Sequence, residues 1–187
     1  KGDMPETGFP DQRIPLHIKD GIGDVYGEIR DRQITRPQFC KALEEARAGE
    51  SDYTRYDREV ARRAAEFLRT EGSVSKSPFA LMAGFVAPHF PLVVPQEYGD
   101  LYPDPEALPL PVQFNREEWP HHPVVDDYRR YCCQEDLPDS VKRNAIRIYY
   151  GLCSFLDAQV GVVLKALKET GLDKNTRVLY CTDHGDT

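Results

Sequence analysis

The sequence contains no run of about 20 apolar residues, which is the length that a membrane-spanning helix needs. It also shows no signal peptide at its beginning, where Lys1 stands in place of an initiating methionine, and this leaves the compartment open. We therefore predict no membrane span within these 187 residues.

The chain has fewer basic residues than acidic ones. The 24 lysines and arginines face 31 aspartates and glutamates, which gives a net charge of −7. Because no basic stripe supplies affinity for phosphates, this balance argues against general nucleic-acid binding. A small anionic substrate would need a local cationic pocket or a metal ion to offset the overall field.

The five cysteines are odd in number and lack the paired spacing of a cysteine-based metal site. Cys153 and Cys181 lie in apolar segments, where we expect buried thiols. The adjacent Cys132 and Cys133 could form a bridge to another group, which the sequence does not decide.

The first half of the chain changes character near residue 51. Residues 1–50 are rich in glycine, proline and charge, and we expect them to be irregular apart from a short helix over 36–48. Apolar residues at helical spacing then predict an amphipathic helix from Ser51 or Asp52 to Gly72. The continuous apolar run 78–85 is typical of a strand buried on both faces of a parallel sheet.

The second half repeats this order. A proline-rich loop over about 86–136, with a turn of helix at 96–101, leads into a helix from Asp139 or Ser140 to Gly171. We expect a bend in this long helix near Gly151 or Gly161, and a closing strand over 177–182. Helix, buried strand, loop, helix and buried strand together indicate an α/β layered fold.

Chemically capable side chains follow both predicted strands. His89 stands between Pro88 and Pro91, and Asp183 and His184 follow the second strand. Because ligands of α/β proteins gather at the carboxyl ends of strands, we expect the two sites to converge. An imidazole there can bind an oxyanion or protonate a leaving group, and an Asp–His pair can ligate a divalent cation.

Each of these residues also has a structural reading. His89 could be a hydrogen-bonding residue of a proline-rich turn, and Asp183 could cap a turn beside a surface histidine. Asp157 is the one acid placed against the apolar stripe of the long helix. It could approach the site, but we favour a hydrogen bond to a buried backbone group.

Four segments resemble the sulfatase family, in its iduronate- and choline-sulfatase-like branch. The buried strand and Pro-His-x-Pro turn, the piece after it, the long helix and the metal-binding turn occur in the family's order. They are residues 78–91, 98–103, 149–161 and 182–186.

The resemblance implies an alkaline-phosphatase-like α/β fold, with helices on both faces of a layered sheet, and hydrolysis of sulfate esters. In that family a cysteine of a Cys-x-Pro-x-Arg motif becomes a formylglycine, the activated nucleophile, and a divalent cation orients the sulfate. Calcium is the expected ion, with magnesium or manganese as alternatives. Asp183 and His184 would be metal ligands, and His89 would contact the sulfate or assist the leaving alcohol. Lys1 faintly matches a sulfate-binding lysine.

The sequence departs from the family pattern at the nucleophile, because none of its five cysteines is followed by x-Pro-x-Arg. Many relatives also have Lys or Arg where this chain has Ala87. We therefore expect residues 1–187 to be the central part of one catalytic domain, incomplete at both ends and inactive alone, with the α/β core at 51–187.

Two other functions stay open at this point. Phosphonate monoester and phosphodiester hydrolases share the fold and an Asp–His metal turn. A non-catalytic homologue, or a binding module that uses the loop around Trp119, belongs to another class. For the sulfatase reading, the partner would be a sulfated small molecule or glycan, in a secreted, lysosomal or periplasmic setting. The sequence does not indicate an oligomeric state.

Overall fold

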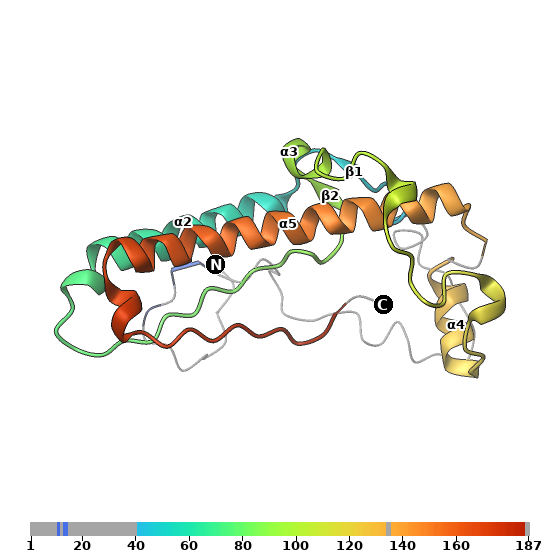
Figure 1. The fold of residues 1–187 in the computed structure, drawn as a ribbon. Coiled ribbons are helices and arrows are strands. Elements are labelled where there is room, and N and C mark those ends of the chain that lie inside the picture. Colours follow the sequence, from blue (N-terminus) through green and yellow to red (C-terminus); the bar gives the residue numbers. More distant parts are fainter. Residues whose placement is uncertain (1–10, 12, 15–40, 134–135, 186–187) are drawn as a thin grey trace. The chain divides into compact units, whose positions relative to one another are not determined.

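A computed structural model describes residues 11, 13–14, 41–133 and 136–185 (Figure 1). The chain divides into two compact units. The larger unit comprises Ala42–Pro109 and Pro138–Thr187, and the smaller unit comprises Lys1–Lys41 and Leu110–Leu137. Lys1 and most of the predicted irregular region 1–50 lie outside the described residues.

Helix α2 (Asp52–Thr70) begins at a complete capping box. The Ser51 Oγ accepts a hydrogen bond from the Thr54 backbone N–H at 3.1 Å, and the Thr54 Oγ1 accepts one from the Ser51 N–H at 3.0 Å. These bonds satisfy backbone donors that a helix start otherwise leaves without a partner. The predicted helix is confirmed, and its start is fixed by the residue that the sequence indicated.

Helix α5 (Asp139–Glu169) runs alongside α2 (Figure 1). Its Ile148, Leu152 and Phe155 are buried in one core cluster, which also includes Val94. A second cluster joins Leu68 of α2 to Ala166 and Leu167 of α5. By length and composition, α5 is long and apolar enough to span a membrane, but here its apolar stripe forms the core of the larger unit.

Helix α5 is continuous over 31 residues, with no interruption at Gly151 or Gly161, where we expected a bend. Gly151 serves close packing instead: a Cβ atom there would lie 3.2 Å from the Tyr98 carbonyl oxygen and 3.3 Å from the Val94 side chain. The missing side chain therefore lets α5 approach the two elements next to it, α3 (Gln96–Gly99) and β2 (Val93–Val94).

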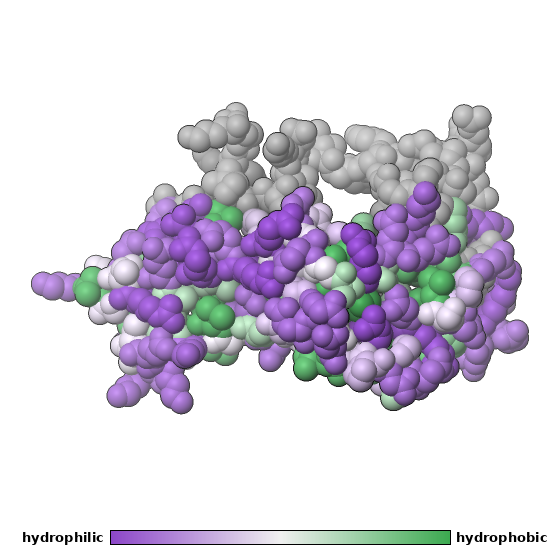
Figure 2. Space-filling model, turned by 90° about the horizontal axis from the view of Figure 1, so that it is seen from above, coloured by the Kyte–Doolittle hydropathy of each residue, from purple (hydrophilic) through white to green (hydrophobic). Residues whose placement is uncertain are grey.

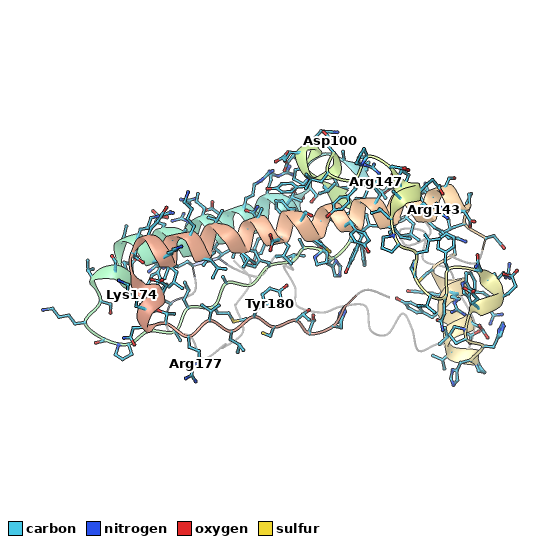
Figure 3. All side chains as sticks on the ribbon, viewed as in Figure 1. Asp100, Arg143, Arg147, Lys174, Arg177 and Tyr180 are labelled. Atoms are coloured by element: carbon cyan, nitrogen blue, oxygen red, sulfur yellow. The ribbon has the colours of Figure 1, made fainter. Side chains whose placement is uncertain are left out.

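A two-stranded parallel sheet covers part of α5. Strand β1 (Arg47–Ala48) pairs with β2 in the register Arg47 to Val93 and Ala48 to Val94. The helix predicted over 36–48 is therefore wrong for residues 41–48, which form turns and β1, while 36–40 lie outside the described residues. Arg147 of α5 closes this region by donating to the Gly99 carbonyl at 3.1 Å (Figure 3).

The predicted strands 78–85 and 177–182 are extended but carry no strand pairing among the described residues (Figure 1, green and red). Met82 is 74% exposed and Leu179 86% exposed, so the expectation of buried strands is not met in this structure. An apolar strand is buried only where neighbouring strands and helices cover both faces, and the described residues supply no neighbouring strand. Cys181, expected to be buried, is exposed for the same reason, and Cys153 is half-buried.

Segment 78–87 is nevertheless held along α2. Near its start the Phe79 ring packs edge-on against Phe67, with ring centroids 5.2 Å apart. At its end it is bound by Asp57 of the same helix. The start of the segment contacts Phe67 in the later part of α2, whereas its end binds Asp57 in the earlier part. The segment therefore runs antiparallel to the helix. This is the arrangement that an α/β layer requires.

The predicted loop 86–136 contains short helices as well as β2 and α3. They are η3 (Pro105–Ala107) in the larger unit, and η4 (Arg116–Glu118) and α4 (Pro123–Tyr131) in the smaller unit. Cys133, after α4, is disulfide-bonded, and its neighbour Cys132 is a buried thiol. The face shown in Figure 2 is mostly hydrophilic, in keeping with the arginine–glutamate pairs along α2.

Replacing Phe155 with alanine should lower the free energy of unfolding by about 3–5 kcal/mol, because its fully buried ring leaves a cavity. The ring packs edge-on against Tyr98 at 5.5 Å, and the Arg58 guanidinium lies 5.5 Å from its centroid. The control is Val162→Ala at a residue 39% exposed on the same helix, with an expected change within about 0.5 kcal/mol. Urea unfolding measures both, and a loss below about 1 kcal/mol for Phe155→Ala would contradict this core.

Candidate active site

His89 lies at the end of a tight turn that follows segment 78–85. The turn is closed by a hydrogen bond from the His89 N–H to the Val86 carbonyl at 3.0 Å, and Ala87–Pro88 is a cis peptide. The Nδ1 of His89 donates to the Phe90 carbonyl at 2.6 Å, because a carbonyl oxygen can only accept. Nδ1 therefore carries the proton, and Nε2 is the nitrogen left to act on a ligand.

Two rings hold the imidazole of His89. Phe90 stacks on it with centroids 4.4 Å apart, and Tyr53 of α2 meets it edge-on at 6.1 Å. His89 itself is exposed. The ring is thus packed on two sides and still open to solvent, as an imidazole that acts on a substrate must be.

Asp57 of α2 holds the backbone of the same turn. Its Oδ1 accepts from the Val86 N–H at 2.8 Å, and its Oδ2 accepts from the Ala87 N–H at 2.8 Å. The residue is completely buried. The sequence interpretation missed it, although the signal was present: Asp57 precedes the apolar Val60, Ala61 and Ala64 at helical spacing, and so sits on the buried stripe.

Asp183 and His184 lie on the extended segment that follows η5 (Leu172–Asn175) and that carries Arg177 and Tyr180 (Figure 3). The Asp183 Oδ1 accepts from the His184 backbone N–H at 2.9 Å, and the His184 Nδ1 donates to the Gly185 carbonyl at 3.0 Å. The His184 Nε2 lies 3.8 Å from the Asp183 Oδ2, with the two side chains 71% and 88% exposed.

His89 and Asp183 influence each other electrostatically. The pKa of the Asp183 carboxyl is lowered, first by the hydrogen bond from the His184 backbone N–H and then by its own N–H and the positive charge of His184. The charge of His89 lowers it further. Such an effect on an exposed carboxyl requires proximity, because water screens distant charges. The side chains of His89 and Asp183, remote in sequence, are therefore within electrostatic range of each other in the larger unit.

The donors at this point fit a divalent cation in part. A carboxylate is a typical ligand of calcium, magnesium and manganese, and an imidazole is a ligand of softer ions. Within residues 41–133 and 136–185, no group of three or more histidine, cysteine or acidic side chains is arranged to hold a metal ion. Asp183 and His184 therefore provide an incomplete ligand set, since calcium takes six to eight oxygens.

The other acid singled out from the sequence is elsewhere. Asp157 is exposed on α5, so the expected hydrogen bond to a buried backbone group is wrong for this residue. Asp157 follows the buried Phe155 and the partly buried Leu156, at a position where the surface of the helix turns toward solvent. The bonding expected of Asp157 is made by Asp57 instead.

The loop around Trp119 forms a cavity of about 240 Å³ in the smaller unit. The Arg129 guanidinium covers the Trp119 ring at 4.7 Å, and Arg116 lies 6.0 Å from it. Both arginines pair with acids, Arg129 with Asp126 at 3.4 Å and Arg116 with Asp136 at 2.9 Å. Because an arginine occupies the ring face and acids offset the arginines, the cavity is poorly suited to stack a sugar or bind a sulfate.

Comparisons with known proteins agree with the geometry. The sequence model of the sulfatase family matches residues 8–187. Choline-sulfatase of Rhizobium meliloti is 32% identical over 143 residues, which is 70% of this chain and 27% of that protein. Arylsulfatase of Clostridium perfringens is 33% identical over 129 residues, covering 68% of this chain and 26% of that protein.

Mouse iduronate 2-sulfatase is 33% identical over 146 residues, which cover 68% of this chain and 24% of that protein. The chain thus spans about a quarter of the length of the curated relatives that it matches. The family match extends over nearly the whole chain and includes the turn of His89 and the Asp183–His184 pair. The chain belongs to the sulfatase family.

Proposed function

We propose that the full-length protein hydrolyses sulfate esters, with a sulfated small molecule or glycan as its substrate. The family supports this chemistry, and the relatives carry the names choline-sulfatase, arylsulfatase and iduronate 2-sulfatase. These names favour a sulfate ester over the phosphonate and phosphodiester alternatives. Residues 1–187 form part of one catalytic domain in this proposal.

The observation that carries the proposal is the imidazole of His89, held by Phe90 and Tyr53 yet exposed, in a chain of the sulfatase family. The Nε2 of this ring can donate or accept a proton, and its charge contributes to the lowered pKa of the Asp183 carboxyl. His89 would contact the sulfate or protonate the leaving alcohol, a role that needs an exposed and oriented ring. Lys1 remains a weak candidate for a sulfate contact and lies outside the described residues.

Asp183 and His184 would hold a divalent cation, most simply calcium, with further ligands from outside the described residues. When bound, such an ion neutralises the charge of the sulfate group. The lowered pKa of Asp183 keeps the carboxylate in the form that binds a cation. The nucleophile of the family is a formylglycine, and its Cys-x-Pro-x-Arg motif does not occur in this sequence.

The disulfide at Cys133 bears on the compartment. Disulfides form and persist in oxidising surroundings such as the secretory pathway or a periplasm, and are rare in a reducing cytosol. This observation supports a secreted, lysosomal or periplasmic location for the full-length protein.

Replacing His89 with alanine should lower kcat for an aryl sulfate at least about a hundredfold, because proton transfer to the leaving group is lost. His122→Ala is the matched control: this histidine caps α4 by accepting from the Val124 N–H at 3.3 Å in the smaller unit, and near-normal turnover is expected. Hydrolysis of 4-nitrophenyl sulfate measures both variants. Unchanged turnover in His89→Ala would exclude His89 from the active site. A preference of the wild type for an aryl phosphonate over the aryl sulfate would contradict the proposed reaction.

Asp183→Ala should abolish bound metal in the full-length protein, because it removes the carboxylate ligand and leaves one imidazole. Asp173→Ala changes an exposed acid of η5, which precedes the extended segment, and should keep the metal. Elemental analysis after dialysis gives the metal content of each variant. Equal metal content in wild type and Asp183→Ala would refute the assignment.

A further inference from the structure

Asp57 is a buried acid that takes no part in the chemistry proposed above. Its side chain is completely buried within α2 and the turn that follows segment 78–85. A buried carboxylate costs free energy unless its oxygens accept hydrogen bonds. Here each oxygen accepts a backbone N–H at 2.8 Å, from Val86 and from Ala87. The two bonds tie a helix to successive residues of one turn.

The helix contacts this turn at a second point, one helical turn earlier. Tyr53 and Asp57 are four residues apart, so they share a face of α2. Tyr53 meets the His89 ring edge-on at 6.1 Å, while Asp57 binds the backbone two and three residues before His89. The side chain of Ala87, in the same turn, is part of the core cluster with Ile148 and Phe155. The turn is therefore fixed by its backbone, by its buried methyl group and by the ring that it presents.

The hydrogen bonds of Asp57 fit an ionised carboxylate, because both of its oxygens accept from N–H donors. The pKa of Tyr56 is raised by its burial and further by the negative charge of Asp57. Hydrogen bonds that a carboxylate accepts from backbone N–H groups are shorter and stronger than those between neutral groups. A charged Asp57 thus makes a firmer attachment than a neutral side chain of the same shape.

We propose that Asp57 is a positioning residue of the active site: it fixes the Val86–His89 turn on α2, and so sets the position of the His89 ring. The inference rests on the proposed function, because it assigns His89 to the reacting centre. Asp57 itself touches no substrate. Its effect passes through two amide bonds and the turn that they hold.

Asp57→Asn is the sharpest variant, because asparagine has nearly the same shape. Its one amide oxygen can accept one of the two N–H bonds, and its NH₂ group would face the other N–H as a second donor. The turn should then loosen without a cavity. Asp57→Glu retains the charge and both acceptors, with one additional methylene, and should restore part of the activity.

Leu68→Ala is the matched control. Leu68 lies on the same helix and is 2% exposed, but it packs in the second core cluster with Ala166 and Leu167. It should destabilise the protein through a cavity while leaving the turn in place. A loss of activity that merely followed stability would therefore occur in both variants.

In the full-length protein, hydrogen–deuterium exchange and steady-state kinetics test the proposal together. Asp57→Asn should accelerate amide exchange in the peptide that contains Val86 and Ala87 at least about tenfold. It should lower kcat for 4-nitrophenyl sulfate by about ten- to a hundredfold, with KM within about threefold, because displacement of a reacting group affects the transition state most. Leu68→Ala should keep wild-type kcat.

Equal kcat and equal exchange in Asp57→Asn and wild type would overturn the proposal, as would an equal loss of kcat in Leu68→Ala. If Asp57→Asn does not fold, the wild type still decides: the Val86 and Ala87 amides should be protected, and exchange at the solvent rate contradicts the bonds. If the wild type cleaves no sulfate ester, the proposed function fails separately, since the exchange measurement needs no substrate.

Discussion

The pair of hydrogen bonds from the Val86 and Ala87 amides to the Asp57 carboxylate is the constraint on which the candidate site depends. It joins α2 to the end of an extended segment that has no paired strand among the described residues. Packing covers this segment unevenly, since Met82 is 74% exposed whereas Ala87 at its end is buried in the core. The buried carboxylate orients the turn as well as holding it, because each of its oxygens binds one particular N–H group.

The packing of α2 and α5 supports this attachment, because α5 contributes to the core in which the turn is buried. Phe155 and Ile148 of α5 bury the Ala87 side chain, and Gly151 lets α5 approach β2 closely. The extended segment after α5 carries Asp183 and His184, and Asp183 lies within electrostatic range of His89. The chain belongs to the sulfatase family, and in α/β folds ligand-binding residues lie at the carboxyl ends of strands. Two helices that form one core thereby bring together groups almost a hundred residues apart.

The sequence predicted the helices well and the strands poorly, for a physical reason. The helices α2 and α5 carry their own signals, a capping box at Ser51 and a periodic apolar stripe, and their hydrogen bonds close within the segment. A strand needs a neighbour for every hydrogen bond, so runs such as 78–85 become strands only where that neighbour is supplied. The candidate residues His89, Asp183 and His184 could be singled out because they follow such runs. Asp57 was not singled out, because the Val86 and Ala87 amides that bind its carboxylate lie far from it in the sequence.

The most direct test of this account is a double-mutant cycle between Asp57→Asn and His89→Ala, read as kcat/KM for sulfate ester hydrolysis by the full-length protein. Residues that act through one another are not additive, whereas independent residues are. If Asp57 acts by positioning His89, the double variant should be no more than about threefold slower than His89→Ala alone. A double variant whose loss equals the product of the two single losses would show that Asp57 and His89 act separately, and would contradict the account.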